Sequence, residues 1–318
     1  MTNKPPLIAI VGPTASGKTS LGVGLASLLS GEILSADSRQ VYRRMNIGTG
    51  KDLSEYTLPD GTSIRYHLID IVEPGEVYDL YRWKKAFNKA LLSIEERGKT
   101  PILVGGSGLY AETALGGRSL TEAPKNDALR QELLHLSHKD LLDILQRFKG
   151  VPQTDTSSVR RTIRAIEIAS YYERHTGKQS QILSQKNELT LPHYLFCLSL
   201  EAPERWERIG KRLRRRIDEG MIEETRSLLN EGVPAETLIQ YGLEYKYITL
   251  YLLGKLDLDT MITELEVAIR QFAKRQMTWF RGMKRRGLNP IFIDATLPQE
   301  AILDKICALL PTKEFAQQ

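Results

Sequence analysis

The sequence is poor in cysteine and has no long apolar run. Among its 318 residues only Cys197 and Cys307 are cysteines, which excludes a disulfide framework and predicts two reduced thiols. No apolar run approaches the roughly 20 residues that cross a bilayer. The first residues, MTNKPPLIAIVG, predict a first strand rather than a signal peptide. We therefore expect a cytoplasmic protein without a membrane partner.

Metal-ligand spacing and extreme charge are also missing. Basic residues exceed acidic ones by 44 to 39, a mild net charge of +5, and 41% of the residues are hydrophobic. This composition is that of a folded globular protein. The basic residues gather in the second half, which is compatible with a polyanionic partner. The histidines, to which we assign no role, are His67, His135, His138, His175 and His193.

Strand and helix signals alternate over the first 110 residues. Buried strands are expected at residues 7–12, 32–38, 66–72 and 101–108. Helical signals occur at residues 19–30 and 77–99, and Gly98 is expected to end the second helix. Such alternation predicts an α/β fold, with a parallel sheet flanked by helices and ligands at the carboxyl ends of the strands.

This pattern is interrupted from about residue 118 to 191, where the signals are helical. We expect residues 118–191 to form a helical insertion domain within a core of residues 1–117 and 192–318. A strand is expected at residues 194–200, long helices follow, and a last strand is expected at residues 290–295. The predicted architecture is a P-loop NTPase-like core with a helical insertion.

The stretch GPTASGKT, residues 12–19, fits a phosphate-binding loop between a strand and a helix. Gly12 and Gly17 permit the turn, while the amides and the helix N-terminus point at an anion. Lys18 reaches the phosphates, and Thr19 offers a hydroxyl to Mg²⁺. ATP is the ordinary ligand of such a loop, so a small-molecule or nucleoside kinase is one alternative.

A nucleotide-hydrolysing enzyme also needs an acid near Mg²⁺. The strand before Gly105 ends in glycines, and Asp70 is a weak candidate. Asp37 is better placed, because it follows the second strand and so lies beside the loop. It can ligate Mg²⁺ through water, accept a proton from a nucleophile, or only cap the next turn.

Residues 205–216 carry seven basic residues and one acid. A stripe with a spacing of four predicts a helix with one buried side, and its members are Ile209, Leu213, Ile217 and Met221. Arg208 is expected to pair with Glu204, and Arg216 with Glu219. Arg212 has no acid three or four residues away, which favours a non-protein anion as its partner; a solvated basic face is the alternative.

Two further basic clusters occur at residues 160–167 and 270–286. The second has seven basic residues and no acid, interleaved with Phe272, Trp279 and Phe280. Basic residues with aromatics suit nucleic acid, although aromatics at helical spacing are also typical of a core. A phosphate loop with three basic helical clusters indicates a small phosphorylated ligand and a polynucleotide.

Six ordered blocks together resemble one family, the tRNA dimethylallyltransferases, or tRNA isopentenyltransferases. The blocks are GPTASGKT, SADSRQVYRRMNIGTGK, HLIDIVEPGEVY, PILVGGSGLY, RRTIRAIEI and AKRQMTWFR. The resemblance implies an insertion that clasps the anticodon stem-loop of tRNA. It implies transfer of a dimethylallyl group from dimethylallyl diphosphate to N6 of adenosine 37, with release of diphosphate. No Cys/His zinc pattern follows the core, as in the compact bacterial type, and nothing demands an oligomer, so a monomer is expected.

The resemblance also implies roles for individual residues. Lys18, Thr19, Asp37 and Arg212 would be catalytic, with Asp37 as the general base and Thr19 as the Mg²⁺ ligand. The adenine would have to leave its stack. The residues expected to bind diphosphate are Gly12, Pro13, Thr14, Ala15, Ser16, Gly17, Lys18, Thr19 and Arg212. The residues expected to bind tRNA are Asp37, Ser38, Arg39, Gln40, Ser107, Arg130, Arg160, Arg161, Arg164, Gly242, Lys246, Lys274, Arg275, Gln276, Thr278, Trp279 and Arg281.

Departures from the family pattern occur at single positions and in one segment. Ser107 stands where threonine is more common, Arg160 where glutamine is, and Gly50 where alanine is. The segment YGLEYKYI, residues 241–248, replaces the usual glycine–tyrosine–lysine–glutamate; Gly242, Glu244 and Lys246 are candidates for those roles. A non-catalytic RNA-binding protein with a relic loop is a second alternative, against which the intact Lys18, Thr19 and Asp37 argue.

Overall fold

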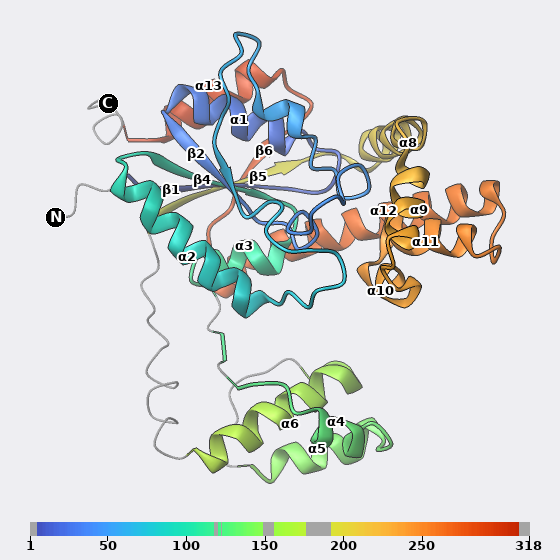
Figure 1. The fold of residues 1–318 in the computed structure, drawn as a ribbon. Helices are drawn as coiled ribbons and strands as arrows, with labels where there is room; N and C mark the ends of the chain where they lie inside the picture. The colour runs from blue at the N-terminus through green and yellow to red at the C-terminus, as the bar shows by residue number, and fades with distance from the viewer. Residues whose placement is uncertain (1–4, 118–119, 122, 149–155, 176–191, 312–318) are drawn as a thin grey trace. The chain divides into compact units, whose positions relative to one another are not determined.

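The computed structural model describes residues 5–117, 120–121, 123–148, 156–175 and 192–311 (Figure 1). The chain divides into two compact units. One comprises Met1–Gly117 and Leu191–Gln318, and the other comprises Arg118–Thr190. The expected ends of the insertion, Arg118 and Leu191, lie outside the described residues.

The first unit is built on a six-stranded sheet in which every neighbouring pair is parallel, in the order β3-β2-β4-β1-β5-β6. The strands are β1 (Leu7–Val11), β2 (Gly31–Ser35), β3 (Tyr66–His67), β4 (Thr100–Gly105), β5 (His193–Ser199) and β6 (Ile291–Asp294). All five residues of β1 and all six of β4 are buried. Strands that are covered on both faces are apolar throughout, which is why they stand out in the sequence. The expected parallel sheet flanked by helices is confirmed.

Helices cover both faces of this sheet (Figure 1). Side chains alternate along β1, so Ile8 and Ile10 pack in one core with α1 (Lys18–Leu28) and α13 (Gln299–Leu309). Ala9 and Val11 point to the other core, which includes Trp83 and Phe87 from α2 (Leu80–Glu96) and Ala111 from α3 (Gly108–Ala114). Because β1, β2 and β4 are parallel neighbours, the loops that follow them lie together at one edge of the sheet.

A group of helices lies beside this edge (Figure 1). Its members are α8 (Ala202–Asp218), α9 (Met221–Asn230), α10 (Ala235–Tyr241), α11 (Leu243–Leu252) and α12 (Leu258–Met283). Helices α8, α9, α11 and α12 share a third core that includes Ile209, Leu213, Ile248 and Leu265, whereas the buried residues of α10 belong to the core that contains Trp83. Short 3₁₀ segments, η1 (Leu53–Tyr56) and η3 (Lys284–Arg286), complete the described elements of this unit.

Several expected element ends were wrong. The strands expected at residues 32–38 and 101–108 end at Ser35 and Gly105. The strand expected at residues 66–72 ends at His67, because Leu68 and Asp70 have positive φ values of 67° and 54°. The stripe from Ile209 to Met221 does not lie on one helix. Gly220, at a φ of 98°, separates α8 from α9, and Met221 is the first residue of α9.

The second unit contains three described helices, α4 (Asp127–Leu133), α5 (His138–Gln146) and α6 (Val159–Arg174). Leu141, Leu145, Ile163 and Ile166 are buried between them. A charged centre lies beside this core: the fully buried carboxylate of Glu167 accepts hydrogen bonds from Arg130 at 2.9 Å and Arg164 at 3.1 Å. In the described parts of the chain, no helix is long and apolar enough to cross a membrane.

The loop between β2 and η1 is held by a buried lysine. The ammonium group of Lys51, which has no exposed surface, pairs with Asp70. It also donates to the Tyr42 carbonyl at 2.6 Å and to Asn46 Oδ1 at 2.9 Å. A buried charge with this set of partners fixes the loop backbone, because each acceptor would otherwise lose its donor.

Replacing Lys51→Met is therefore expected to lower the free energy of unfolding by about 3 kcal/mol, since Asp70 loses its counter-charge. Urea denaturation followed by circular dichroism measures the change. Lys89→Met is the matched control, because Lys89 lies on the exposed face of α2 and should cost less than about 0.5 kcal/mol. Equal losses in the two variants would contradict a role for the buried pair.

Candidate active site

The phosphate loop connects β1 to α1 and has the backbone that its glycines predict. Gly17 has a φ of 79° and directly precedes Lys18, the first residue of α1, and Ala15 also lies in the left-handed region, at 61°. The Lys18 ammonium donates to the Pro13 carbonyl at 2.6 Å, so it folds back over the loop. Burial, and then the nearby charge of Arg212, lower the pKa of Lys18 to about 8.

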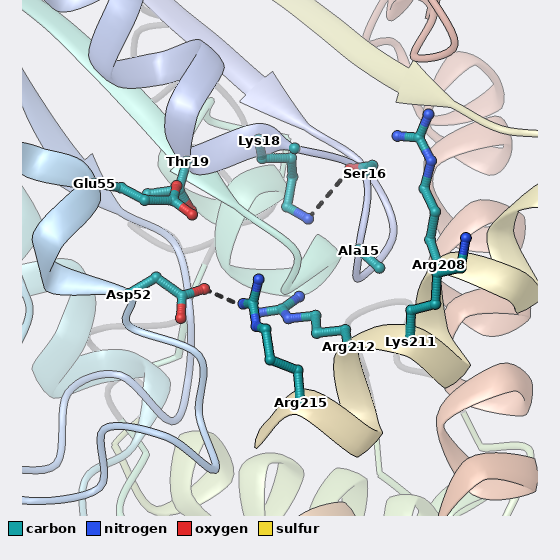
Figure 2. A pocket seen from close by; sticks show the side chains of 11 residues that line it. Ala15, Ser16, Lys18, Thr19, Asp52, Glu55, Arg208, Lys211, Arg212 and Arg215 are labelled. Atoms are coloured by element: carbon teal, nitrogen blue, oxygen red, sulfur yellow. Dashed lines mark hydrogen bonds and ion pairs between the residues drawn. The ribbon is translucent and has the colours of Figure 1, made fainter. Parts of the chain in front are cut away.

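Two cavities open at this loop. The phosphate-loop cavity has a volume of about 380 Å³ (Figure 2). Its lining consists of Ala15, Ser16, Gly17, Lys18, Thr19, Asp52, Glu55, Arg208, Lys211, Arg212 and Arg215. The Asp37 cavity has a volume of about 250 Å³ and includes Asp37, Gln40, Ser107, Glu244 and Phe272. Lys18, Thr19 and Arg212 line both cavities, which makes them the link between the two.

Arg212 has a carboxylate partner from outside its own helix, while a non-protein anion as its ligand stays a prediction. Its Nη2 lies 3.3 Å from Oδ2 of Asp52 (Figure 2). Its Nη1 donates to Thr14 Oγ1 at 3.3 Å. Burial, and then the positive charge of Arg216, lower the pKa of Arg212 to about 10. Asp52 is 160 residues away in the sequence, and no local spacing could reveal this contact.

The pairing expected for Arg216 was also wrong. Arg216 Nη2 bonds Asp52 Oδ1 at 3.2 Å and Oδ2 at 3.0 Å, whereas Glu219 pairs with Arg215 at 3.2 Å. The expected pair of Arg208 with Glu204 is confirmed at 2.6 Å. Arg216 is buried, so a fully solvated basic face does not describe this helix.

Asp37 has the capping role expected from the sequence, and its second oxygen leaves the other roles open. Its Oδ1 accepts the backbone N–H of Arg39 at 2.8 Å and of Gln40 at 3.4 Å, so it caps the turn after β2. Asp37 also lines the cavity, and among the described residues Oδ2 has no hydrogen-bond donor. Ser107 Oγ accepts the N–H of Ser38 at 3.2 Å, which joins the loops after β2 and β4. One oxygen of Asp37 is thus fixed and the other is open to a ligand.

The segment 241–248 forms another part of the cavity wall. Gly242 has a φ of 81° with a ψ of −177°, a conformation that favours glycine. It ends α10 and precedes α11, so it separates the two helices. Gly242 and Glu244 line the Asp37 cavity, and burial raises the pKa of Glu244. Lys246 does not line either cavity; its ammonium lies 4.9 Å from the ring of Tyr247.

The expected contact residues on α12 occupy different environments. Gln276 is buried, accepts the N–H of Thr14 at 2.9 Å and donates to the Gly106 carbonyl at 2.8 Å, so it ties the phosphate loop to the end of β4. Trp279 is half-buried beside Gly108, and Phe280 belongs to the core. The exposed residues of this set are Lys274, Arg275, Thr278 and Arg281.

The expected contact residues of the second unit divide in the same way. Arg130 and Arg164 are bound to the buried Glu167, and Arg164 also donates to the Ala123 carbonyl at 2.6 Å. Arg160 and Arg161 are exposed near the start of α6. The sequence therefore predicted the exposed cations on this helix. The contacts of Glu167 with Arg130 and Arg164 could be identified only from the folded structure.

A model of the IPP transferase family matches residues 40–283. The chain belongs to this family, the tRNA dimethylallyltransferases. It is 49% identical to tRNA dimethylallyltransferase 2 of Bacteroides fragilis over 310 residues, which covers 97% of this chain and 98% of that protein. It is 47% identical to tRNA dimethylallyltransferase 2 of Phocaeicola vulgatus, over 96% of this chain and 98% of the relative.

Solved structures of the family have the same fold. The full-length tRNA isopentenylpyrophosphate transferase of Bacillus halodurans has a TM-score of 0.69 at 30% identity, covering 99% of this chain and 98% of that one. The enzyme of Staphylococcus epidermidis has a TM-score of 0.67 at 30% identity, covering 96% and 99%. Family membership over nearly the whole chain decides against the kinase alternative.

The lowered pKa of Lys18 predicts how diphosphate binding depends on pH. A protonated Lys18 attracts the anion, and the ligand-free protein loses this proton as the pH rises through about 8. The affinity for inorganic diphosphate at constant Mg²⁺ is therefore expected to fall by about tenfold per pH unit above 8.

Isothermal titration calorimetry between pH 6.5 and 9.5 measures this dependence. Lys18→Arg is the control, because its guanidinium stays charged and should remove the step near pH 8. Diphosphate ionises equally in both titrations. The same step in both proteins would show that Lys18 is not the titrating group.

Proposed function

We propose that this protein transfers the dimethylallyl group of dimethylallyl diphosphate to N6 of adenosine 37 in tRNA and releases diphosphate. The observation that carries the proposal is a single cavity that joins an open carboxylate oxygen, on Asp37, to the phosphate loop and Arg212. A carboxylate and cations that line one cavity suit a nucleophile that loses a proton and a leaving group that gains negative charge.

The charges that develop in this reaction match the residues present. Breaking the bond between the allylic carbon and oxygen leaves positive charge on carbon and negative charge on diphosphate. The loop amides, Lys18 and Arg212 stabilise the negative charge in a partly buried site. The adenine amine is a poor nucleophile because its lone pair is delocalised into the ring. Asp37 accepts its hydrogen bond and takes its proton.

Magnesium is the cofactor that this chemistry favours. Among the described residues, no group of three His, Cys, Asp or Glu side chains is placed to hold a metal ion. Mg²⁺ commonly has few protein ligands and is bound through substrate phosphates and water. The Thr19 hydroxyl, at the start of α1 and in both cavities, fits such a ligand set. The ion would neutralise part of the diphosphate charge.

Transfer RNA is the proposed acceptor. The 250 Å³ of the Asp37 cavity suit one extruded base and the short prenyl group, whereas a stacked base cannot enter. The exposed Lys274, Arg275 and Arg281 of α12, and Arg160 and Arg161 of the second unit, supply cations for the RNA backbone. A monomer acting in the cytoplasm, where tRNA is available, completes the proposal.

Direct transfer tests this function. The protein is incubated with Mg²⁺, radiolabelled dimethylallyl diphosphate and an unmodified tRNA that has adenosine at position 37. We expect label in the RNA, and nuclease digestion should release it as the N6-modified nucleoside. The same tRNA with guanosine at position 37 is the control and should stay unlabelled. An unlabelled adenosine tRNA, or equal labelling of both, would refute the proposal.

The role of Asp37 is tested by Asp37→Asn, which keeps an Oδ1 acceptor for the turn but cannot take the proton. We expect a fall in kcat of about 10²–10⁴-fold, with tRNA affinity changed less than about threefold. Single-turnover kinetics and filter binding measure the two quantities.

Asp60→Asn is the matched control for this substitution. Asp60 Oδ1 accepts the N–H of Thr62 at 2.9 Å in an exposed turn, and this variant should leave kcat unchanged. A loss of tRNA affinity in Asp37→Asn as large as its loss of rate would assign Asp37 to the turn alone.

A further inference from the structure

An internal anion already occupies Arg212, which lines the phosphate-loop cavity, and its neighbour Arg216. The carboxylate of Asp52 contacts Arg212 at 3.3 Å and Arg216 at 3.0 Å (Figure 2 shows the first contact). The side chains of Asp52 and Arg212 are partly exposed to this cavity, at 24% and 26%, while that of Arg216 is only 6% exposed. An anion entering the cavity meets the first two residues together.

We propose that Asp52 is a positioning residue that occupies Arg212 when the donor site is empty and gives it up to the diphosphate. Asp52 would thereby set how tightly diphosphate is held and how readily it leaves. The inference rests on the proposed function, because that function makes diphosphate the anion of this cavity.

The need for Asp52 follows from the like charges around it. Arg212 and Arg216 lie one helical turn apart on α8, and Lys18 is close enough to Arg212 for its pKa to be lowered. Adjacent like charges at this spacing oppose each other, and partial burial strengthens the effect. A single carboxylate that touches both guanidiniums compensates this repulsion without a ligand.

The contacts also indicate which arginine is exchanged. Arg212 has a single contact of 3.3 Å with Asp52, lines the phosphate-loop cavity, and already reaches Thr14 of the loop. Arg216 has two contacts with Asp52, at 3.0 and 3.2 Å; it lines the Asp37 cavity but not the phosphate-loop cavity, where Asp52 lies. Diphosphate can therefore take Arg212 while Asp52 remains on Arg216.

The backbone around Asp52 favours movement of the arginine rather than of the carboxylate. Asp52 has a φ of 43° and follows Lys51, which is anchored by its buried contacts. Gly50, at a φ of 65°, approaches so closely that a Cβ there would lie 2.2 Å from the Nη2 atoms of Arg212 and Arg216. The loop is fixed against the guanidiniums, and the flexible Arg212 side chain is the part that turns.

Binding of inorganic diphosphate in Mg²⁺, without tRNA or donor, tests the exchange. Isothermal titration calorimetry should give a dissociation constant about tenfold lower for Asp52→Asn than for the unchanged protein, because the competing anion is gone. Glu55→Gln is the matched control. It removes a carboxylate that lines the same cavity near Arg212 but has no ion-pair partner among the described residues, and its constant should change less than about threefold.

Kinetics distinguish exchange from a merely structural role. Asp52→Asn should lower both the KM for dimethylallyl diphosphate and kcat, because the product is released more slowly, and should strengthen inhibition by diphosphate. Asp52→Glu, which keeps the charge, should stay near the unchanged protein in all three. The melting temperature of Asp52→Asn should fall without diphosphate and recover with it, since the ligand restores a counter-charge.

Unchanged or weaker diphosphate binding in Asp52→Asn would overturn the inference, as would equal tightening in Glu55→Gln, which would indicate a general effect of cavity charge. The two proposals fail separately. If the unchanged protein binds diphosphate but does not label tRNA, the proposed function is refuted and the exchange stands on the binding data. If it labels tRNA while Asp52→Asn binds diphosphate no better, only the exchange is refuted.

Discussion

The concentration of positive charge at the phosphate loop is the constraint on which the rest of the site depends. A site for a polyanion must hold Lys18, Arg212 and Arg216 close together before the anion arrives. Asp52 provides the counter-charge, but only if its loop is fixed in place. The buried Lys51 anchors that loop from within. The repulsion between the cations at the phosphate loop is thus compensated by a carboxylate from a segment that is distant in the sequence.

The same loop is also held from outside by α9. The carboxylate of Glu224 accepts three successive backbone N–H groups, from Asn46 at 2.7 Å, Ile47 at 2.8 Å and Gly48 at 3.0 Å. Such a set of charge-assisted hydrogen bonds is stronger than neutral ones and leaves the loop little freedom. Because α8 and α9 are consecutive, the arginines and the loop that compensates them are positioned by one helical pair.

The features that could be predicted from the sequence are those that a run of neighbouring residues determines. The strands β1 and β4 are apolar along their length, and GPTASGKT has a spacing that only a tight anion-binding turn explains, so the sheet and the loop were found. The partners of Arg212 and Arg216 could not be found in this way. Helical spacing offered Glu219 to Arg216, but the contact of Arg216 Nη2 with both oxygens of Asp52, in a less exposed place, is favoured over an exposed pair. Charge partners are chosen by tertiary proximity and burial, which no local spacing contains.

The segment YGLEYKYI shows how the same limit applies to a departure from a family pattern. The Tyr241 hydroxyl accepts the N–H of Gly75 at 2.7 Å, and the Tyr245 hydroxyl donates to Glu224 at 2.7 Å. Both tyrosines therefore hold loops around the cavity, and Tyr245 completes the carboxylate that fixes residues 46–48. Glu244, between them, lines the Asp37 cavity, as both tyrosines also do. The segment thus supplies hydrogen bonds that hold the surrounding loops and an acid in the wall of the Asp37 cavity, and each of these contacts is made with residues far away in the sequence.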